Sequence, residues 1–201
     1  MKTTSLKIKF VTILASLAIL FGVLPVSPVA ASSIDISLDE FRSALSSTDP
    51  SKVVGVYVDE ILAVRVVKQS SPSHVSNIFN SVTRFDQADL FGSVGLLAHN
   101  YLSGTHFSKI DIGTKIHLVY GDGSSKDYTV TTIKQYQALS PDDPYSNFIN
   151  LEEPGLQVSS THVTKEMYGT SGTLVLQTCI TKDGNLNWGR LFIIASPISQ
   201  E

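Results

Sequence analysis

Short runs of β-branched and other apolar residues, separated by turn signals, recur along most of this chain. They begin at Val53–Val58 and Ile61–Val67, and further runs cover residues 90–98, 115–120, 127–136, 173–179 and 190–196. The segment Gly121–Ser125 reads Gly-Asp-Gly-Ser-Ser, which is typical of a hairpin turn. Many short strands with turn signals between them predict a mostly β domain over residues 51–201, folded as a closed or nearly closed barrel.

Short helices are expected at the periphery of this barrel. Residues 37–40 read Ser-Leu-Asp-Glu, a capping box, and Leu38, Phe41 and Leu45 then share one helical face. We therefore expect residues 32–50 to form an N-terminal helical extension, which ends at Pro50. The spacing of Val75, Ile78, Phe79 and Val82 predicts a second helix, and residues 161–168 predict a third with Thr161 as its cap.

The first 31 residues have the layout of a secretory signal. Three lysines precede an almost wholly apolar stretch over residues 10–26, and Val29-Ala30-Ala31 offers small residues for cleavage. The sequence therefore predicts a signal peptide over residues 1–31 and an exported protein, with an uncleaved N-terminal anchor as the alternative. The apolar stretch is short for a membrane span, which needs about 20 residues.

The charge of the chain bears on its partners. Removing residues 1–31 removes three lysines and no acidic residue, so the net charge goes from −3 to −6. No basic cluster remains, which argues against nucleic acid as a partner.

Three of the apolar runs each carry one chemically reactive side chain. Cys179, the sole cysteine, ends one run, Arg190 begins another, and His99 follows a third. A lone cysteine with a distant histidine and a nearby arginine is the set needed for a thiolate nucleophile, its acid/base partner and a charge stabiliser. The turn signal Asp183-Gly184-Asn185 between Cys179 and Arg190 makes a hairpin that places them side by side plausible.

Each of these residues also has an ordinary structural interpretation. A lone cysteine is often buried and inert, a histidine beside an apolar strand is often part of the core, and an arginine at a strand end is often a surface charge. His106 and His117 are weaker candidates for the base, while His74 and His162 look like residues at helix starts.

The residues around the three side chains resemble those of the sortases, enzymes that attach proteins to bacterial cell walls. Leu176-Gln177-Thr178-Cys179 is similar to the active-site strand of that family, although Val175 stands where the family has Thr. Ala98-His99-Asn100 is similar to the segment around the family's histidine, and Gly189–Ile193 to its last strand with the essential arginine. The resemblance spans residues 94–196, and the stretch between Tyr128 and Thr173 is unusually long for the family.

The resemblance implies an eight-stranded barrel and assigns the chemistry. Cys179 would attack the scissile carbonyl and form a thioacyl intermediate. His99 would protonate the leaving amine and then take a proton from the incoming amine. Arg190 would hold the substrate backbone and stabilise the oxyanion, and a backbone N–H near Thr178 would complete that site.

The long stretch before residue 173 holds candidates for substrate and ion binding. Tyr145, Phe148, Ile149 and Leu151 are expected to line the groove for a sorting peptide, with covering of the barrel as the alternative. No spacing of ligands resembles a zinc site, and no cofactor is predicted. Calcium stays open, because Asp142, Asp143, Glu152 and Glu153 carry the oxygen ligands that it prefers, although a solvated loop is the favoured interpretation.

These expectations describe an exported cysteine transpeptidase that acts in the cell wall or at the outer face of the cytoplasmic membrane. Its partners would be the sorting motif of exported proteins, of the LPxTG kind, and an amine from a wall peptide or a pilin lysine. A hydrolase using the same residues and a secreted barrel that only binds its partners are the alternatives.

Overall fold

The computed structural model describes residues 35–45, 47 and 49–199, so the predicted signal peptide over residues 1–31 lies outside the described part. Within that part no helix is both long and apolar enough to cross a membrane. The elements along the chain are α1 (Leu38–Ala44), β1 (Val53–Val58), β2 (Leu62–Lys68), β3 (Ser81–Phe85), α2 (Asp86–Asp89), β4 (Val94–Ala98), the 3₁₀ helix η1 (Ser103–Lys109), β5 (Lys115–Tyr120), β6 (Ser125–Ala138), β7 (Phe148–Asn150), β8 (Gln157–Val158), α3 (Ser160–Tyr168), β9 (Leu174–Lys182) and β10 (Asn185–Pro197).

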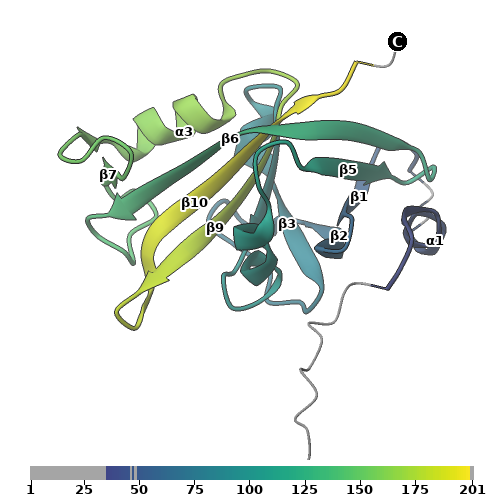
Figure 1. Ribbon diagram of the computed structural model, residues 1–201, viewed down its shortest axis with the longest axis horizontal. Helices are drawn as coiled ribbons and strands as arrows, with labels where there is room; N and C mark the ends of the chain where they lie inside the picture. The colour runs from purple at the N-terminus through teal and green to yellow at the C-terminus, as the bar shows by residue number, and fades with distance from the viewer. Residues whose placement is uncertain (1–34, 46, 48, 200–201) are drawn as a thin grey trace, which may run out of the picture. The chain divides into compact units, whose positions relative to one another are not determined.

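Eight strands close into a barrel. Their order is β10-β9-β4-β3-β2-β1-β5-β6, and the pairing of β6 with β10 closes the ring (Figure 1). The short strands β7 and β8 extend the sheet from the far end of β6, beyond the part that pairs with β5. The predicted fold, mostly β with a closed eight-stranded barrel and short peripheral helices, is confirmed.

Alternation along the strands separates the barrel interior from its outer surface. On β9, Leu174 and Leu176 belong to the main core cluster inside the barrel, whereas Val175 packs on the outside with Phe192 of β10 and Tyr168 of α3. Helix α3 thus covers the outer face of β9, β10 and β6, as Figure 1 shows. The same alternation puts residues 177 and 179 on the outer face, and this decides where the sulfur of Cys179 points.

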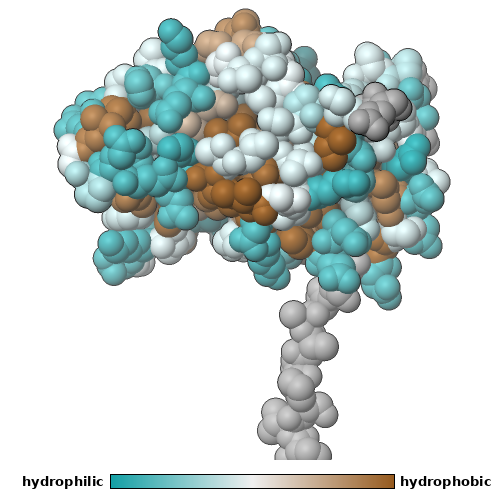
Figure 2. Space-filling view, turned by 45° about the horizontal axis from the view of Figure 1, so that its top comes forward, coloured by the Kyte–Doolittle hydropathy of each residue, from teal (hydrophilic) through white to brown (hydrophobic). Residues whose placement is uncertain are grey.

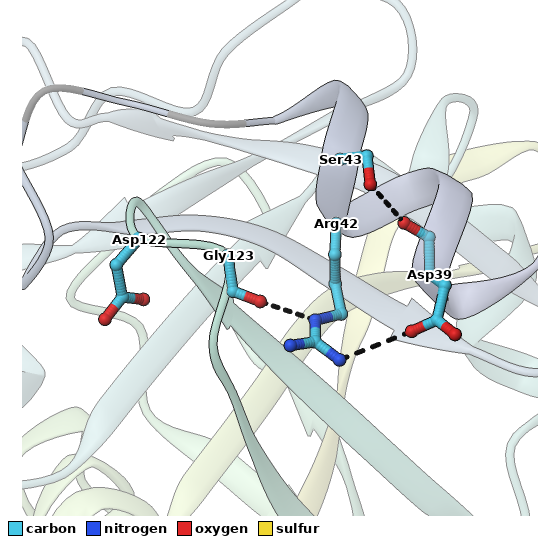
Figure 3. Close-up of a pocket in the computed structure, with 5 residues that line it drawn as sticks. All are labelled: Asp39, Arg42, Ser43, Asp122 and Gly123. Atoms are coloured by element: carbon cyan, nitrogen blue, oxygen red, sulfur yellow. Dashed lines mark hydrogen bonds and ion pairs between the residues drawn. The ribbon is translucent and has the colours of Figure 1, made fainter.

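Helix α1 begins where the sequence predicts. The Ser37 hydroxyl accepts from the N–H of Glu40, and the Glu40 carboxylate accepts from the N–H of Ser37, which completes the capping box. Phe41 packs on β1 and β5 in a small cluster of its own. On its other side, the Arg42 guanidinium donates to the carbonyl of Gly123 in the β5–β6 turn and pairs with Asp39 at 3.4 Å (Figure 3). These contacts fix the extension to the barrel wall.

The predicted helix at residues 75–82 is absent from the described structure. Residues 75–78 are irregular, and Val82 lies in β3, which pairs in parallel with β2. The N-cap of α3 is Ser159 rather than Thr161, because the Ser159 hydroxyl accepts from the N–H of His162.

The face in Figure 2 carries apolar residues in several patches separated by hydrophilic side chains.

Candidate active site

Cys179 and Arg190 lie opposite each other on neighbouring strands. The antiparallel register of β9 and β10 pairs them directly, as the hairpin signal between them predicts. Residues that are paired in this way point to the same face, which here is the outer face of the barrel. Burial raises the pKa of the Cys179 thiol above its usual value, and the charge of Arg190 acts in the opposite direction. Arg190 is therefore close enough to favour the thiolate, although burial has the larger effect.

Three backbone carbonyls hold the guanidinium of Arg190. Its Nη1 donates to the carbonyls of Asn187 and Gly189, both at 2.9 Å, and its Nη2 donates to that of Pro141 at 3.2 Å. A guanidinium has five N–H donors. Two of them, one on Nε and one on Nη2, have no partner in these contacts.

His99 follows directly after β4, which pairs in parallel with β9. The last paired residues are Ala98 and Thr178, so the chain positions of His99 and Cys179 come next along the two strands. The His99 ring stacks on Tyr101 with the centroids 4.9 Å apart, and its Nε2 lies 3.2 Å from the carbonyl oxygen of Val75. A carbonyl only accepts, so Nε2 carries the hydrogen and Nδ1 is left to exchange protons.

No hydrogen bond joins the His99 ring to the sulfur of Cys179 in the described part of the chain; the ring is bonded to Val75 instead. Catalytic hydrogen bonds are often long or misaligned without substrate and tighten when it binds.

The side chain of Thr178 has a structural role. It is 4% exposed, and its hydroxyl donates to the carbonyl of Ala98 at 2.9 Å. Gly104 packs so closely here that a Cβ would collide with the Thr178 hydroxyl and the main chain of His99. The β4–η1 connection is therefore packed tightly against β9 beside Cys179.

An open hollow of about 380 Å³ adjoins Cys179 on the side of η1. No charged side chain lines it. It combines hydroxyl and amide groups with two apolar residues, and its lining residues are Asn100, Gly104, Thr105, Ser108, Gln135, Thr178, Cys179, Ile180, Thr181 and Leu191.

The four residues expected to line a peptide groove differ in exposure. Tyr145 is 79% exposed in the loop after β6, and Ile149 and Leu151 are partly exposed. Phe148 is only 5% exposed and packs with Tyr136 in the cluster under α3. For Phe148 the expectation of substrate contact is therefore wrong, and the alternative, that it covers the barrel, holds.

Two of the four acidic side chains of this stretch are bonded to side chains on β6 and β10. Glu152 pairs with Lys134 of β6, and Asp142 accepts from the side chain of Asn187 at 3.0 Å. In residues 35–199 other than 46 and 48, no three His, Cys, Asp or Glu side chains are grouped to hold a metal. Calcium binding stays an untested alternative.

His117 and His106, the weaker candidates for the base, have different environments. His117 on β5 binds Asp127 through Nδ1 at 2.7 Å and lies beside Tyr57, on the side of α1. His106 lies in η1, where burial, helped by Lys109, lowers its pKa.

Sequence reasoning did not identify Val75, Tyr101 and Pro141 as contacts of His99 and Arg190. The position of Tyr101, two residues after His99, was the one available signal, because backbone carbonyls leave no trace in a sequence.

Comparison with known proteins finds likenesses of fold. The chain is similar to sortase C1 of Streptococcus agalactiae in its complex with MTSET, with 17% identity and a TM-score of 0.48 over 78% of this chain and 72% of that one. It is also similar to sortase A of Listeria monocytogenes, with 18% identity and a TM-score of 0.45 over 73% and 88% of the two chains. A sortase D5 transpeptidase of Clostridium perfringens gives 16% identity and 0.45 over 82% and 91%. No protein-family model and no curated protein matches the chain. These likenesses concern the fold and do not bear on its chemistry.

Proposed function

We propose that this chain is an exported cysteine transpeptidase of the sortase kind. The observation that carries the proposal is the register pairing of Cys179 with Arg190, with His99 at the end of the strand on the other side of β9. A nucleophile, a permanent cation and an acid/base group from three strands thus converge at one end of the barrel wall.

The chemistry proceeds in two balanced steps. The Cys179 thiolate attacks the carbonyl of the sorting motif, the C–N bond breaks, and protonated His99 gives its Nδ1 proton to the departing amine. An acceptor amine then attacks the thioester, neutral His99 takes a proton from that amine, and the thiolate leaves. The free N–H groups of Arg190 stabilise the negative oxygen in both steps.

The substrates are proposed from the family resemblance, and the residues that contact the peptide are proposed from their exposure. The donor is a C-terminal sorting motif of the LPxTG kind, and the acceptor is an amine of a wall peptide or a pilin lysine. Tyr145, Ile149 and Leu151 are the members of the stretch after β6 that can reach such a peptide, since they are exposed or partly exposed.

Two observations favour a different class, a barrel that binds without catalysis. Burial raises the pKa of the Cys179 thiol, and the His99 ring is bonded to Val75 instead of the sulfur. Both features disfavour the thiolate, which is the form of cysteine that reacts as a nucleophile.

The test separates transfer, hydrolysis and binding. The protein is incubated with an LPxTG peptide, with and without an added amine, and intact mass follows both the enzyme and the products. We expect an acyl adduct on Cys179 and an amine-linked product, both absent in Cys179→Ala. Cleavage without amine linkage would indicate a hydrolase, and no adduct with peptide or with an electrophilic mimic would contradict the proposal.

Export is proposed from the first 31 residues. The mature protein should begin near Ser32, because the small residues before it suit signal peptidase. Intact mass of secreted material tests this, and a species that keeps Met1 and partitions with membranes would mean an anchor instead.

A further inference from the structure

The register that aligns β4 with β9 ends just before His99. Strands β4 and β9 pair over Val94–Ala98 and Leu174–Thr178. His99 comes directly after the last register pair, so no register pair joins it to Cys179. Beyond this point the two chains diverge, β4 into η1 and β9 into the hairpin with β10.

The side chain of Asn100 bridges this gap. Its Nδ2 donates to the Thr181 hydroxyl of β9 at 2.8 Å and to the carbonyl of Leu186 in β10 at 2.7 Å. The carbonyl of Leu186 only accepts, so the amide nitrogen must face it. Both hydrogens of the one NH₂ group are thus used, and they tie the residue after His99 to both strands of the hairpin that carries Cys179 and Arg190.

We infer that Asn100 is a positioning residue that sets the distance and angle between His99 and Cys179; this rests on the function proposed above. His99 is held on its other side by Val75 and Tyr101, and Tyr101 donates its hydroxyl to Asn77 at 3.1 Å. Without Asn100, the segment 99–101 stays fastened to the β2–β3 connection but loses its side-chain tie to the β9–β10 hairpin. Misplacement of a reacting group by about 1 Å can lower a rate about a hundredfold.

The test compares variants that remove the donor, the acceptor or neither. Asn100→Ala removes both hydrogen bonds, Thr181→Val removes one acceptor at nearly constant shape, and Thr181→Ser keeps it. We expect kcat to fall about ten- to hundredfold in Asn100→Ala with KM nearly unchanged. Thr181→Val should fall less, and Thr181→Ser should keep most of its activity. The Thr181 pair answers the question if Asn100→Ala fails to fold.

A matched control lies on the same hairpin. Asn185 is exposed and uses its Oδ1 to accept from the N–H of Asn187 at 2.8 Å, which a carboxylate also does. Asn185→Asp should therefore leave the rate unchanged, whereas Asn100→Asp replaces the donating group by an acceptor that faces the Leu186 carbonyl. Equal rates for these two variants would overturn the inference.

A second readout is independent of transpeptidation. The rate at which iodoacetamide alkylates Cys179 is measured against pH for wild type, Asn100→Ala, His99→Ala and the double variant. If Asn100 acts through His99, its profile shifts in the direction of His99→Ala, and the double variant shifts no further than His99→Ala alone. A wild-type profile in Asn100→Ala, with only a lowered melting temperature, would reduce Asn100 to a structural contact. Absence of any acyl-enzyme in wild type would instead defeat the proposed function, and the alkylation profiles would still test the positioning role.

Discussion

Arg190 is the residue whose surroundings most limit what can replace it. Its guanidinium donates from Nη1 to the carbonyls of Asn187 and Gly189 and from Nη2 to that of Pro141. An ammonium is a point donor on a flexible stem and does not reproduce this planar fork. These three bonds hold the guanidinium in one orientation.

We therefore predict that Arg190→Lys is nearly as inactive as Arg190→Ala while both variants fold. Loss of one oxyanion donor typically costs about a hundred- to a thousandfold in rate. Arg65→Lys is the control, because Arg65 is exposed on β2 and lies outside the site. Transpeptidation rates are measured with thermal unfolding alongside. Near-normal turnover in Arg190→Lys would mean that Arg190 supplies charge alone.

Two opposed effects act on the pKa of the Cys179 thiol. Burial disfavours the thiolate and raises the pKa, whereas the cation of Arg190 favours the thiolate and lowers it. Removing the cation leaves burial unopposed, so the pKa must rise further.

In Arg190→Gln the alkylation of Cys179 should accordingly need a higher pH than in wild type. Only the thiolate reacts with iodoacetamide, so the midpoint of rate against pH reads the thiol pKa directly. Arg65→Gln should leave the midpoint in place. A midpoint that is unchanged or lower in Arg190→Gln would show that the two side chains do not interact.

At the scale of elements, local signals were enough for some parts of the fold and not for others. The capping box set the start of α1, and the turn signal at residues 183–185 correctly predicted the hairpin that pairs Cys179 with Arg190. The parallel pairing of β4 with β9 joins residues about 80 positions apart. No local pattern encodes it, so the approach of His99 to the site came from family resemblance alone.

The segment at residues 75–82 shows why spacing alone misled the helix prediction. Apolar residues at helical intervals occur there, but tertiary hydrogen bonds decide the conformation. The N–H of Ser76 donates to the Thr83 hydroxyl at 2.8 Å, and the Gln69 side chain donates to the carbonyls of Pro72 and His74. The resulting irregular segment presents the Val75 carbonyl to His99.

Phe148 of β7 and Tyr145 in the preceding loop allow packing and substrate contact to be tested separately. Phe148 is buried against Tyr136, with the ring centroids 6.2 Å apart, whereas Tyr145 is largely exposed. Phe148→Ala should lower the free energy of unfolding by about 3–5 kcal/mol. Tyr145→Ala should leave it within about 0.5 kcal/mol and change only the KM for the peptide. Chemical denaturation and peptide kinetics on both variants check this, and the reverse pattern would contradict the exposure of the two rings.

At the scale of the whole molecule, one strand pairing closes the barrel, and we call it the seam. The pairing of β6 with β10 closes the ring, and it runs from Gly189 opposite Gln137 to Pro197 opposite Tyr128. The same β10 pairs on its other edge with β9, so the strand that closes the barrel also carries Arg190 to the site. Closure of the barrel and the position of Arg190 in the candidate site are therefore coupled at the start of this seam.

Gly189 tests that coupling. A Cβ at this position would lie 2.6 Å from the carbonyl oxygen of Tyr136, which is main chain of the facing strand and cannot swing away. Gly189→Ala should thus force β6 and β10 apart beside Arg190 and cost about 1–3 kcal/mol of stability. Asn147→Ala, in an exposed loop position, is the control and should cost little. Hydrogen exchange should show faster opening of amides in β6 and β10 near residues 136 and 189, with β1 and β2 least affected. Wild-type stability and exchange in Gly189→Ala would show that the seam tolerates separation at this end, and that closure of the barrel does not fix the position of Arg190.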